Sequence, residues 1–249
     1  MKKVVLITGV ASGIGNATAS LFAEEGWHVI GVDLKSMNDL KGIHHFIQAD
    51  ISEVANSQGI FKEIKVDESH IDALINNAAI QICKPLIETT LDEWNFLMRS
   101  NLTSIYLNVR NAYPLMKANG GSIVNISSVH GVATSTNIAA YAASKGALLS
   151  LTRALAIEFA HDNIRVNAVL PGAVDTPMLR SGLHRGHLEC FEAQNSLKEL
   201  SRRTVMGRIG KPQEIAQAIL FFADGKRSSF ITGQTLIVDG GATARLSTE

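Results

Sequence analysis

The stretch VVLITGVASGIG, residues 4–15, decides the fold. Its first half is a continuous apolar run, which is typical of a strand buried on both faces of a parallel sheet. Its second half places Gly9, Gly13 and Gly15 ahead of a helical pattern over residues 14–25. A glycine-rich turn between strand and helix lets backbone N–H groups approach a pyrophosphate, whose charge the helix N-terminus stabilises. The stretch therefore predicts a dinucleotide-binding turn, with a tight turn that binds nothing as the alternative.

Strand and helix patterns alternate along the rest of the 249 residues. Because helices separate the strands, we expect a doubly wound α/β fold: a seven-stranded parallel sheet with helices on both faces. No linker or repeat divides the chain, so one domain over residues 1–249 is expected. The expected strands are 4–8, 27–33, 44–50, 71–79, 121–128, 164–172 and 234–241, and the expected helices are 14–25, 53–65, 92–118 with an interruption near Ser100-Asn101, 141–161, and one after Pro212.

The composition excludes several classes of protein. Lys+Arg and Asp+Glu both number 23, and this balance argues against nucleic-acid binding and against a polybasic membrane anchor. No stretch approaches the roughly 20 apolar residues of a membrane span. Cys83 and Cys190 are the only cysteines, so a disulfide framework is not expected and a reducing compartment fits. We expect a cytoplasmic protein with no nucleic-acid and no membrane partner.

Two acidic residues end expected strands. Asp33 lies 18 residues beyond Gly15, where a carboxylate accepts hydrogen bonds from the adenosine ribose and repels a 2′-phosphate. This position favours NAD over NADP, although Lys35 is a nearby cation that could compensate a phosphate. Asp50, followed by Ile51, ends the third expected strand and is either an adenine contact or a strand-end cap.

The stretch YAASK, residues 141–145, puts Tyr141 and Lys145 one helical turn apart on the same face. A neighbouring cation stabilises a phenolate, so the pKa of Tyr141 should fall toward the working range of a general acid or base. In isolation the spacing is a weak signal that favours a packed tyrosine with a snorkelling lysine. Ser128 ends the fifth expected strand, where its hydroxyl would hold a substrate oxygen; Ser127 is the competitor, and alternation sends the two side chains to opposite faces.

Together these motifs resemble the short-chain dehydrogenase/reductase superfamily, in its compact single-domain branch, over essentially the whole chain. The matching motifs are TGVASGIG (8–15), NNAA (76–79), NISS (125–128), YAASK (141–145) and PGAVDTP (171–177). The resemblance implies a Rossmann-type fold in which Asn101, Ser128, Tyr141 and Lys145 are catalytic, with Asn101 supporting a water that relays protons to Lys145. The family's NNAG is NNAA here, and we expect Ala79 to require only a small backbone adjustment.

The resemblance also implies a cofactor site that spans the sheet edge. Asn76 and Ala78 match the turn that contacts the adenosine ribose, and Lys145 matches the lysine that holds the nicotinamide ribose. The implied cofactor-binding residues are Gly9, Ser12, Gly13, Ile14, Gly15, Asp33, Asp50, Ile51, Asn77, Ala78, Tyr141, Lys145, Pro171, Gly172, Val174 and Thr176.

A variable segment at about 177–207 is expected to form a substrate loop. It contains His184, His187 and Cys190 three residues apart, but no metal is expected because structural zinc usually takes four ligands. Gln81, His130 and Thr134 are further candidates for the substrate pocket. The small residues Ala142, Gly146 and Ala154 are candidates for a helix–helix contact between subunits, and the resemblance implies a homotetramer or, failing that, a dimer.

These features predict an NAD(H)-dependent oxidoreductase that moves a hydride between a small-molecule secondary alcohol, or a sugar or polyol hydroxyl, and the nicotinamide. An NADPH-dependent reductase of 3-oxoacyl thioesters or other ketones is the alternative, and Asp33 argues against it. A dinucleotide sensor without turnover is a third hypothesis, but such a protein would be expected to lose Tyr141 or Lys145. The sequence does not identify the substrate or the direction of the reaction.

Overall fold

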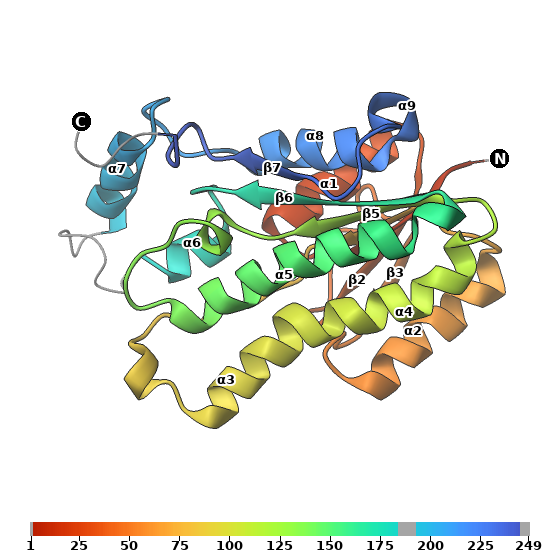
Figure 1. The fold of residues 1–249 in the computed structure, drawn as a ribbon, viewed down its shortest axis with the longest axis horizontal. Helices are drawn as coiled ribbons and strands as arrows, with labels where there is room; N and C mark the ends of the chain where they lie inside the picture. The colour runs from red at the N-terminus through yellow and green to blue at the C-terminus, as the bar shows by residue number, and fades with distance from the viewer. Residues whose placement is uncertain (1, 184–192, 245–249) are drawn as a thin grey trace.

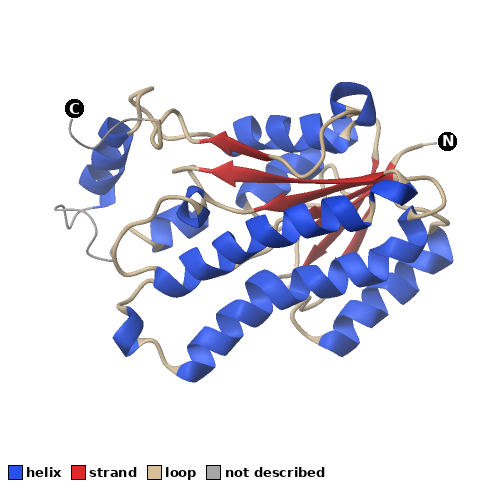
Figure 2. Ribbon diagram, in the orientation of Figure 1, coloured by secondary structure: helices blue, strands red, loops and turns tan. Residues whose placement is uncertain are grey.

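The computed structural model describes residues 2–183 and 193–244 of the chain. In this part a seven-stranded parallel sheet runs through the centre of the molecule (Figures 1 and 2). Its strand order is β3-β2-β1-β4-β5-β6-β7, so the predicted doubly wound fold is confirmed. The order reverses between β1 and β4, and in such sheets ligands bind beyond the carboxyl ends of the strands at the reversal. The strands are β1 Val4–Thr8, β2 His28–Asp33, β3 His45–Gln48, β4 Ala73–Asn76, β5 Gly121–Ile126, β6 Ile164–Pro171 and β7 Thr235–Val238.

Helices cover both faces of the sheet (Figure 2). The helices are α1 Gly13–Glu24, α2 Val54–Asp67, α3 Leu91–Met98, α4 Ser104–Met116, α5 Ala139–Glu158, α6 Pro177–Ser181, α7 Ala193–Arg203, α8 Pro212–Ala223 and α9 Gly225–Ser228. Short 3-10 turns cover Leu86–Glu88, Val129–Gly131 and Ala160–Asp162. None of the described helices is long and apolar enough to span a membrane.

Alternation along the strands divides the core into two layers. Leu6 of β1 and Ile123 of β5 pack with α2, α4 and α5, whereas Ile7 and Val124 pack with α1 and α8. All four side chains are at most 1% exposed. Because both faces of each central strand are covered, these strands are continuous apolar runs, as the sequence predicted.

The expected interruption of the long helix after residue 91 is present. A π-helical turn, Arg99–Thr103, separates α3 from α4 and carries the buried Asn101. Such a turn widens the helix and changes the direction of the side chains on it. The interruption therefore points Asn101 into the molecule.

Two segments show how far the sequence-based expectation holds. The fourth expected segment, 71–79, is a strand that runs into a turn: β4 covers Ala73–Asn76, and Asn77 and Ala78 turn away to bond Thr8. The segment after Pro177 contains α6 and α7 rather than only irregular structure. Thr176 starts α6 because its hydroxyl accepts a hydrogen bond from the N–H of Leu179, and Pro177 fits the first turn.

Candidate functional site

The glycine loop packs α1 so closely against the end of β1 that side chains are excluded. A Cβ added to Gly15 would lie 1.9 Å from the carbonyl oxygen of Gly9. Gly9 has φ +75°, and a Cβ there would lie 2.8 Å from the Cα of Ala78. Ser12 holds the N-cap position, yet its side chain makes no capping hydrogen bond. The first N–H groups of α1 have no partner inside the helix, which is the arrangement that binds a phosphate.

The turn after β4 is tied to this loop. Thr8 Oγ1 accepts hydrogen bonds from the backbone N–H groups of Asn77 and Ala78, each at 3.1 Å. The Asn77 amide donates to the carbonyl oxygens of Thr8, at 2.9 Å, and Gly9, at 3.1 Å. The Asn77 side chain therefore shapes the loop. Among described residues the non-glycines with positive φ are Asn137 and Asn163, so Ala79 needs no glycine-like backbone.

Asp33 is held by the backbone on both carboxylate oxygens. Oδ2 accepts a hydrogen bond from the N–H of Ala11 in the glycine loop at 2.8 Å, and Oδ1 accepts one from the N–H of Lys35 at 2.9 Å. A hollow of about 340 Å³ lies beside it, between the start of α1 and the segment after β2. Ser12, Asn16 and Lys41 line this hollow. Lys41 escaped the sequence reasoning because nothing local marks the segment after β2 as folding back to α1.

Asp50 forms a hydrogen bond to the backbone of its own turn, as expected if it caps this segment. Its Oδ1 accepts a hydrogen bond from the N–H of Ser52 at 2.8 Å, and Ile51 is 8% exposed. Ser52 Oγ is the buried side-chain polar atom that lacks a hydrogen-bond partner in the described part of the chain. A buried hydroxyl without a partner is unfavourable unless a ligand supplies one.

Tyr141 and Lys145 lie in the first turns of α5. Lys145 is 2% exposed, and its ammonium donates to the carbonyl oxygen of Ile126 at 2.8 Å. The ammonium also lies 5.5 Å from the centroid of the Tyr141 ring. Burial lowers the pKa of Lys145 from 10.5 to about 8, because desolvation disfavours the charged amine. The pair is therefore closely associated, and the lysine does not snorkel to solvent.

The two serines after β5 have different partners. Ser127 Oγ donates to the carbonyl oxygen of Lys145 at 2.9 Å and so fixes α5 to the sheet. Ser128 Oγ accepts a hydrogen bond from the N–H of His130 at 3.2 Å. The His130 ring packs edge-on against Tyr141 with 5.9 Å between centroids. The structure thus brings the Ser128 turn, His130 and Tyr141 together, and Thr134 adds a contact to His130 Nδ1 at 2.9 Å.

Asn101 joins this group through its amide. Its Oδ1 accepts from the N–H of Ile80 at 2.8 Å, and its Nδ2 donates to the carbonyl oxygen of Ile80 at 2.9 Å and to Ser144 Oγ at 3.2 Å. Ser144 Oγ in turn donates to the carbonyl oxygen of Tyr141 at 2.8 Å. Sequence reasoning missed Ser144. Its position three residues after Tyr141 and one before Lys145, on the same side of the helix, could have identified it as a neighbour of the pair.

The segment after β6 faces the glycine loop. A Cβ added to Gly13 would lie 3.1 Å from Thr176 Cγ2, and one added to Gly172 would lie 2.6 Å from Asp239 Cβ. Val174, 4% exposed, forms a bridge with Gly210. Pro171 ends β6 in register with Val238 of β7. This segment therefore packs against the glycine loop through Thr176 and Gly13, and Ile14 is the next residue of that loop.

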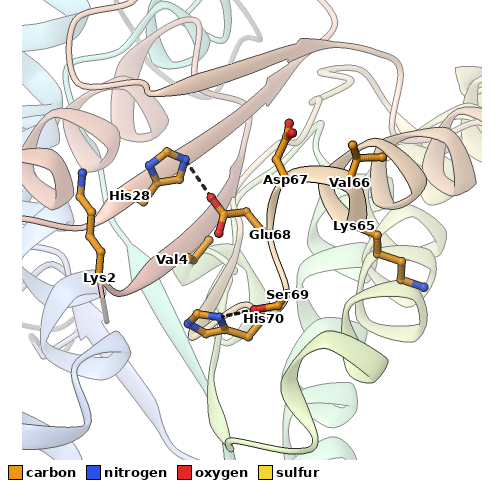
Figure 3. Close-up of a pocket in the computed structure, with 9 residues that line it drawn as sticks. All are labelled: Lys2, Val4, His28, Lys65, Val66, Asp67, Glu68, Ser69 and His70. Atoms are coloured by element: carbon orange, nitrogen blue, oxygen red, sulfur yellow. Dashed lines mark hydrogen bonds and ion pairs between the residues drawn. The ribbon is translucent and has the colours of Figure 1, made fainter.

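Two features remain: the segment with His184, His187 and Cys190, and a hollow at the other edge of the sheet. His184, His187 and Cys190 fall outside the described residues; within residues 2–183 and 193–244 no cluster of ligands for a metal is found. A hollow of about 480 Å³ opens at the amino ends of β1 and β2, the opposite edge of the sheet (Figure 3). His28 there pairs with Glu68 at 3.2 Å, so this hollow is built from matched charges and is separate from the site.

The site fits a dinucleotide. The glycine cradle, the uncapped N-terminus of α1 and the Ser52 hydroxyl without a partner follow the carboxyl ends of β1 and β3, on one side of the reversal. The Tyr141–Lys145 pair and the amide of Asn101 lie on the other side, next to β5.

Comparison with known proteins agrees with this arrangement. A family model described as enoyl-(acyl carrier protein) reductase matches residues 9–243. The chain is 36% identical over 252 residues to cyclopentanol dehydrogenase of Comamonas testosteroni, covering 97% of each chain. It is 38% identical over 255 residues to 3-oxoacyl-(acyl-carrier-protein) reductase of Thermotoga maritima, covering 96% of this chain and 97% of the relative. The ligand-free aldohexose dehydrogenase of Thermoplasma acidophilum superposes with a TM-score of 0.92 at 34% identity, covering 99% of this chain and 96% of that one.

The chain belongs to the short-chain dehydrogenase/reductase family. It is an oxidoreductase of the kind that acts on CH–OH groups or the matching ketones with a nicotinamide dinucleotide.

Proposed function

We propose that the protein is an NAD(H)-dependent dehydrogenase that interconverts a secondary alcohol, or a sugar or polyol hydroxyl, and the ketone. The observation that carries this proposal is the phenol of Tyr141 beside the buried ammonium of Lys145. A buried cation stabilises a nearby phenolate strongly, because the low local dielectric strengthens the attraction.

Each residue has a separate role in the proposed reaction. Tyr141 takes the hydroxyl proton of the alcohol during oxidation and returns it to the ketone oxygen during reduction. Ser128 orients that oxygen, Lys145 stabilises the phenolate, and Asn101 holds the Ile80 backbone and Ser144 around them. The bound dinucleotide supplies the hydride chemistry, and the protein supplies position and electrostatics.

The cofactor would lie along the carboxyl edge of the sheet. Its nicotinamide end would contact Lys145 and the segment from Pro171 to Thr176, and its pyrophosphate would lie at the start of α1. The remaining adenosine contacts would come from Asp33, Asp50, Ile51 and the Asn77-Ala78 turn. One domain over residues 1–249, with its substrate loop at 177–207, would enclose the whole site.

Asp33 supports NAD over NADP. Its two oxygens are fixed by the N–H groups of Ala11 and Lys35, so the carboxylate cannot turn away from a ribose at this strand end. A 2′-phosphate beside it would be repelled, whereas ribose hydroxyls would donate to it. Lys35 is exposed, and the hydrogen bond that it makes to the Asp33 carboxylate comes from its backbone N–H.

Parallel fluorescence titrations with NADH and NADPH test the proposal. Wild-type protein is expected to bind NADH more tightly, and Asp33→Ala is expected to lose most of that preference while Lys35→Ala keeps it. A wild-type preference for NADPH would overturn the assignment. A screen of secondary alcohols and polyols with NAD would then identify the substrate, and Tyr141→Phe should abolish turnover without abolishing NADH binding.

A second candidate is an NADPH-dependent reductase of 3-oxoacyl thioesters. The 38% identity to the Thermotoga maritima relative of that name favours it. Asp33 weighs against it, and the same titration separates the two.

We also propose a homotetramer with two-fold axes. Tyr106 on α4 is 51% exposed and Ile157 on α5 is 79% exposed, and these helices lie side by side along one face (Figure 1). Phe230 and the edge strand β7, with Leu236 and Ile237, offer a second apolar surface. Large exposed apolar groups on two faces are typical of self-association. Mass by light scattering is the test, and a monomer at micromolar concentration would contradict it.

The three small residues predicted for a subunit contact on α5 differ in exposure. Ala154 is exposed, whereas Ala142 and Gly146 are half-buried. Gly146 also approaches its own chain, since an added Cβ would be 3.6 Å from the Gly131 carbonyl oxygen. All three residues stay candidates for this contact, with Ala154 the most accessible of them.

A further inference from the structure

Gln81 connects the loop after β4 to α6. Its Nε2 donates to the carbonyl oxygen of Met178 at 2.5 Å and lies 3.3 Å from Ser181 Oγ. These two residues belong to the helix that directly follows the segment from Pro171 to Thr176. Gln81 is 97 residues away from Met178 in the sequence, so this is a tertiary contact across the mouth of the site.

The short helix depends on contacts at both of its ends. Five residues are too few for a helix to be stable by itself, so its position depends on contacts with the rest of the chain. Thr176 caps the N-terminus through Leu179 N–H at 3.2 Å. At the C-terminus the Met178 carbonyl accepts from the Gly182 N–H at 3.2 Å and from Ser181 Oγ at 2.9 Å, and Gln81 adds a donor from outside the helix. Gly182 leaves room for it, since a Cβ at that position would lie 2.7 Å from Gln81 Nε2.

The loop that carries Gln81 is itself rigid. Both backbone groups of Ile80 are held by the Asn101 amide, at 2.8 and 2.9 Å. Gln81 therefore extends from a fixed backbone. Through Gln81 the position of α6 depends on Asn101, which also bonds Ser144 next to Lys145.

We propose that Gln81 is a positioning residue that latches α6 over the site and thereby sets the affinity for the substrate. The latch itself is independent of the reaction, whereas its effect on substrate rests on the proposed dehydrogenase function. Because Gln81 holds a helix rather than a reacting atom, it should govern KM more than kcat.

Gln81→Glu tests the latch with little change in shape, since a carboxylate accepts but does not donate. Hydrogen exchange of the Gly182 amide, which bonds the Met178 carbonyl at 3.2 Å, reports the position of α6 without cofactor or substrate. We expect exchange to become about tenfold faster, as for loss of about one strong hydrogen bond. Gln213→Glu on the exposed side of α8 adds the same charge elsewhere and should leave exchange unchanged. Unchanged exchange in Gln81→Glu would overturn the latch.

A second pair of variants approaches the same contact from the other side. Gly182 has φ −89°, so alanine fits its backbone, and Gly182→Ala should loosen α6 only by displacing Gln81. In a Gln81→Ala background the added methyl group has room, so the double variant should exchange no faster than Gln81→Ala. Additive acceleration would contradict a shared mechanism.

Steady-state kinetics with the alcohol found in the screen complete the test. Gln81→Glu should raise KM for the alcohol about five- to tenfold while kcat and NADH affinity stay near wild type. Faster exchange with an unchanged KM would overturn the role in substrate binding. If no alcohol is oxidised at all, the proposed function fails, and the exchange data still decide the latch.

Discussion

Replacing Lys145 by methionine should stabilise the protein while abolishing its activity. The ammonium is 2% exposed, and among the described residues no carboxylate forms an ion pair with it. Burial lowers its pKa from 10.5 to about 8. One pKa unit corresponds to about 1.4 kcal/mol, so keeping this group charged costs about 3 kcal/mol at neutral pH. Methionine removes that cost but leaves the carbonyl of Ile126 without its 2.8 Å donor, a loss of about 1 kcal/mol.

The net gain should therefore be about 2 kcal/mol in the free energy of unfolding. For a chain of this size that corresponds to a rise in Tm of about 4–8 °C. Thermal and urea unfolding of the cofactor-free proteins at pH 7, at one protein concentration, provide the measurement. Lys117→Met, which removes an exposed lysine after α4, is the matched control and should change little.

The pH dependence gives the sharper test. Between pH 8 and 10.5 the unfolded chain binds more protons at Lys145 than the folded chain does, so the stability of wild type rises with pH in this window. The advantage of Lys145→Met should therefore shrink above pH 8 and turn into a small disadvantage by about pH 10.5, because the loss of about 1 kcal/mol from the Ile126 hydrogen bond remains. A Met variant that is less stable at pH 7, or a difference independent of pH, would refute the reasoning.

Three further changes probe other parts of the molecule. Gly15→Ala should abolish NADH binding in the fluorescence titration, because its Cβ would meet the Gly9 carbonyl oxygen at 1.9 Å. Asn125→Leu should lower the free energy of unfolding in urea by about 2–4 kcal/mol, because it strands buried hydrogen-bonding partners on two sides. The pKa of His44 is lowered by burial and by the nearby charges of Lys2 and His28, so the unfolded chain takes up its proton first and stability falls as pH drops below 6.5. His44→Gln should lose less stability than wild type between about pH 7 and 5.5, and an equal loss would contradict this.

The parts of the fold that the sequence predicted are those set by local chemistry. The glycine spacing, the apolar strands and the Tyr141–Lys145 spacing each follow from neighbours within a few residues, and the structure has all three. The break near Asn101 was also predicted, but its form as a π-helical turn was not. Such a turn depends on the amide finding Ile80 on another element, a contact that no local pattern contains.

The contacts that sequence reasoning missed all join distant segments. Gln81 was only a candidate for the pocket, because its partner Met178 is far along the chain. Gly146 suggested a subunit contact because it is small, and its approach to Gly131 of the same chain was not foreseen. In both cases the residue type indicated that the position makes a contact, but the sequence did not identify the residue on the other side of that contact.

Buried hydrogen bonds are more numerous around the elements that carry Tyr141 and Lys145 than around α6, and this difference affects which part of the site controls each step. A buried chain of side chains runs beneath the Tyr141–Lys145 pair: Asn108 donates to Asn76 at 3.2 Å, Asn76 to Asn125 at 2.9 Å, and Asn125 to Thr152 at 3.0 Å. These four residues come from α4, β4, β5 and α5 and are at most 1% exposed, so they bind the elements that carry the acid–base pair into one rigid floor. The helix α6, which we call the wall of the site, is held by Gln81, whose neighbour Ile80 is bonded to Asn101 rather than to these four residues. Proton and hydride transfer need positions fixed to a fraction of an ångström, so we expect them to depend on the elements that the four buried residues hold together. Discrimination between substrates should depend on α6, which has fewer buried hydrogen bonds to the rest of the molecule. Substitutions in the wall should therefore change which alcohol is oxidised without changing how it is oxidised.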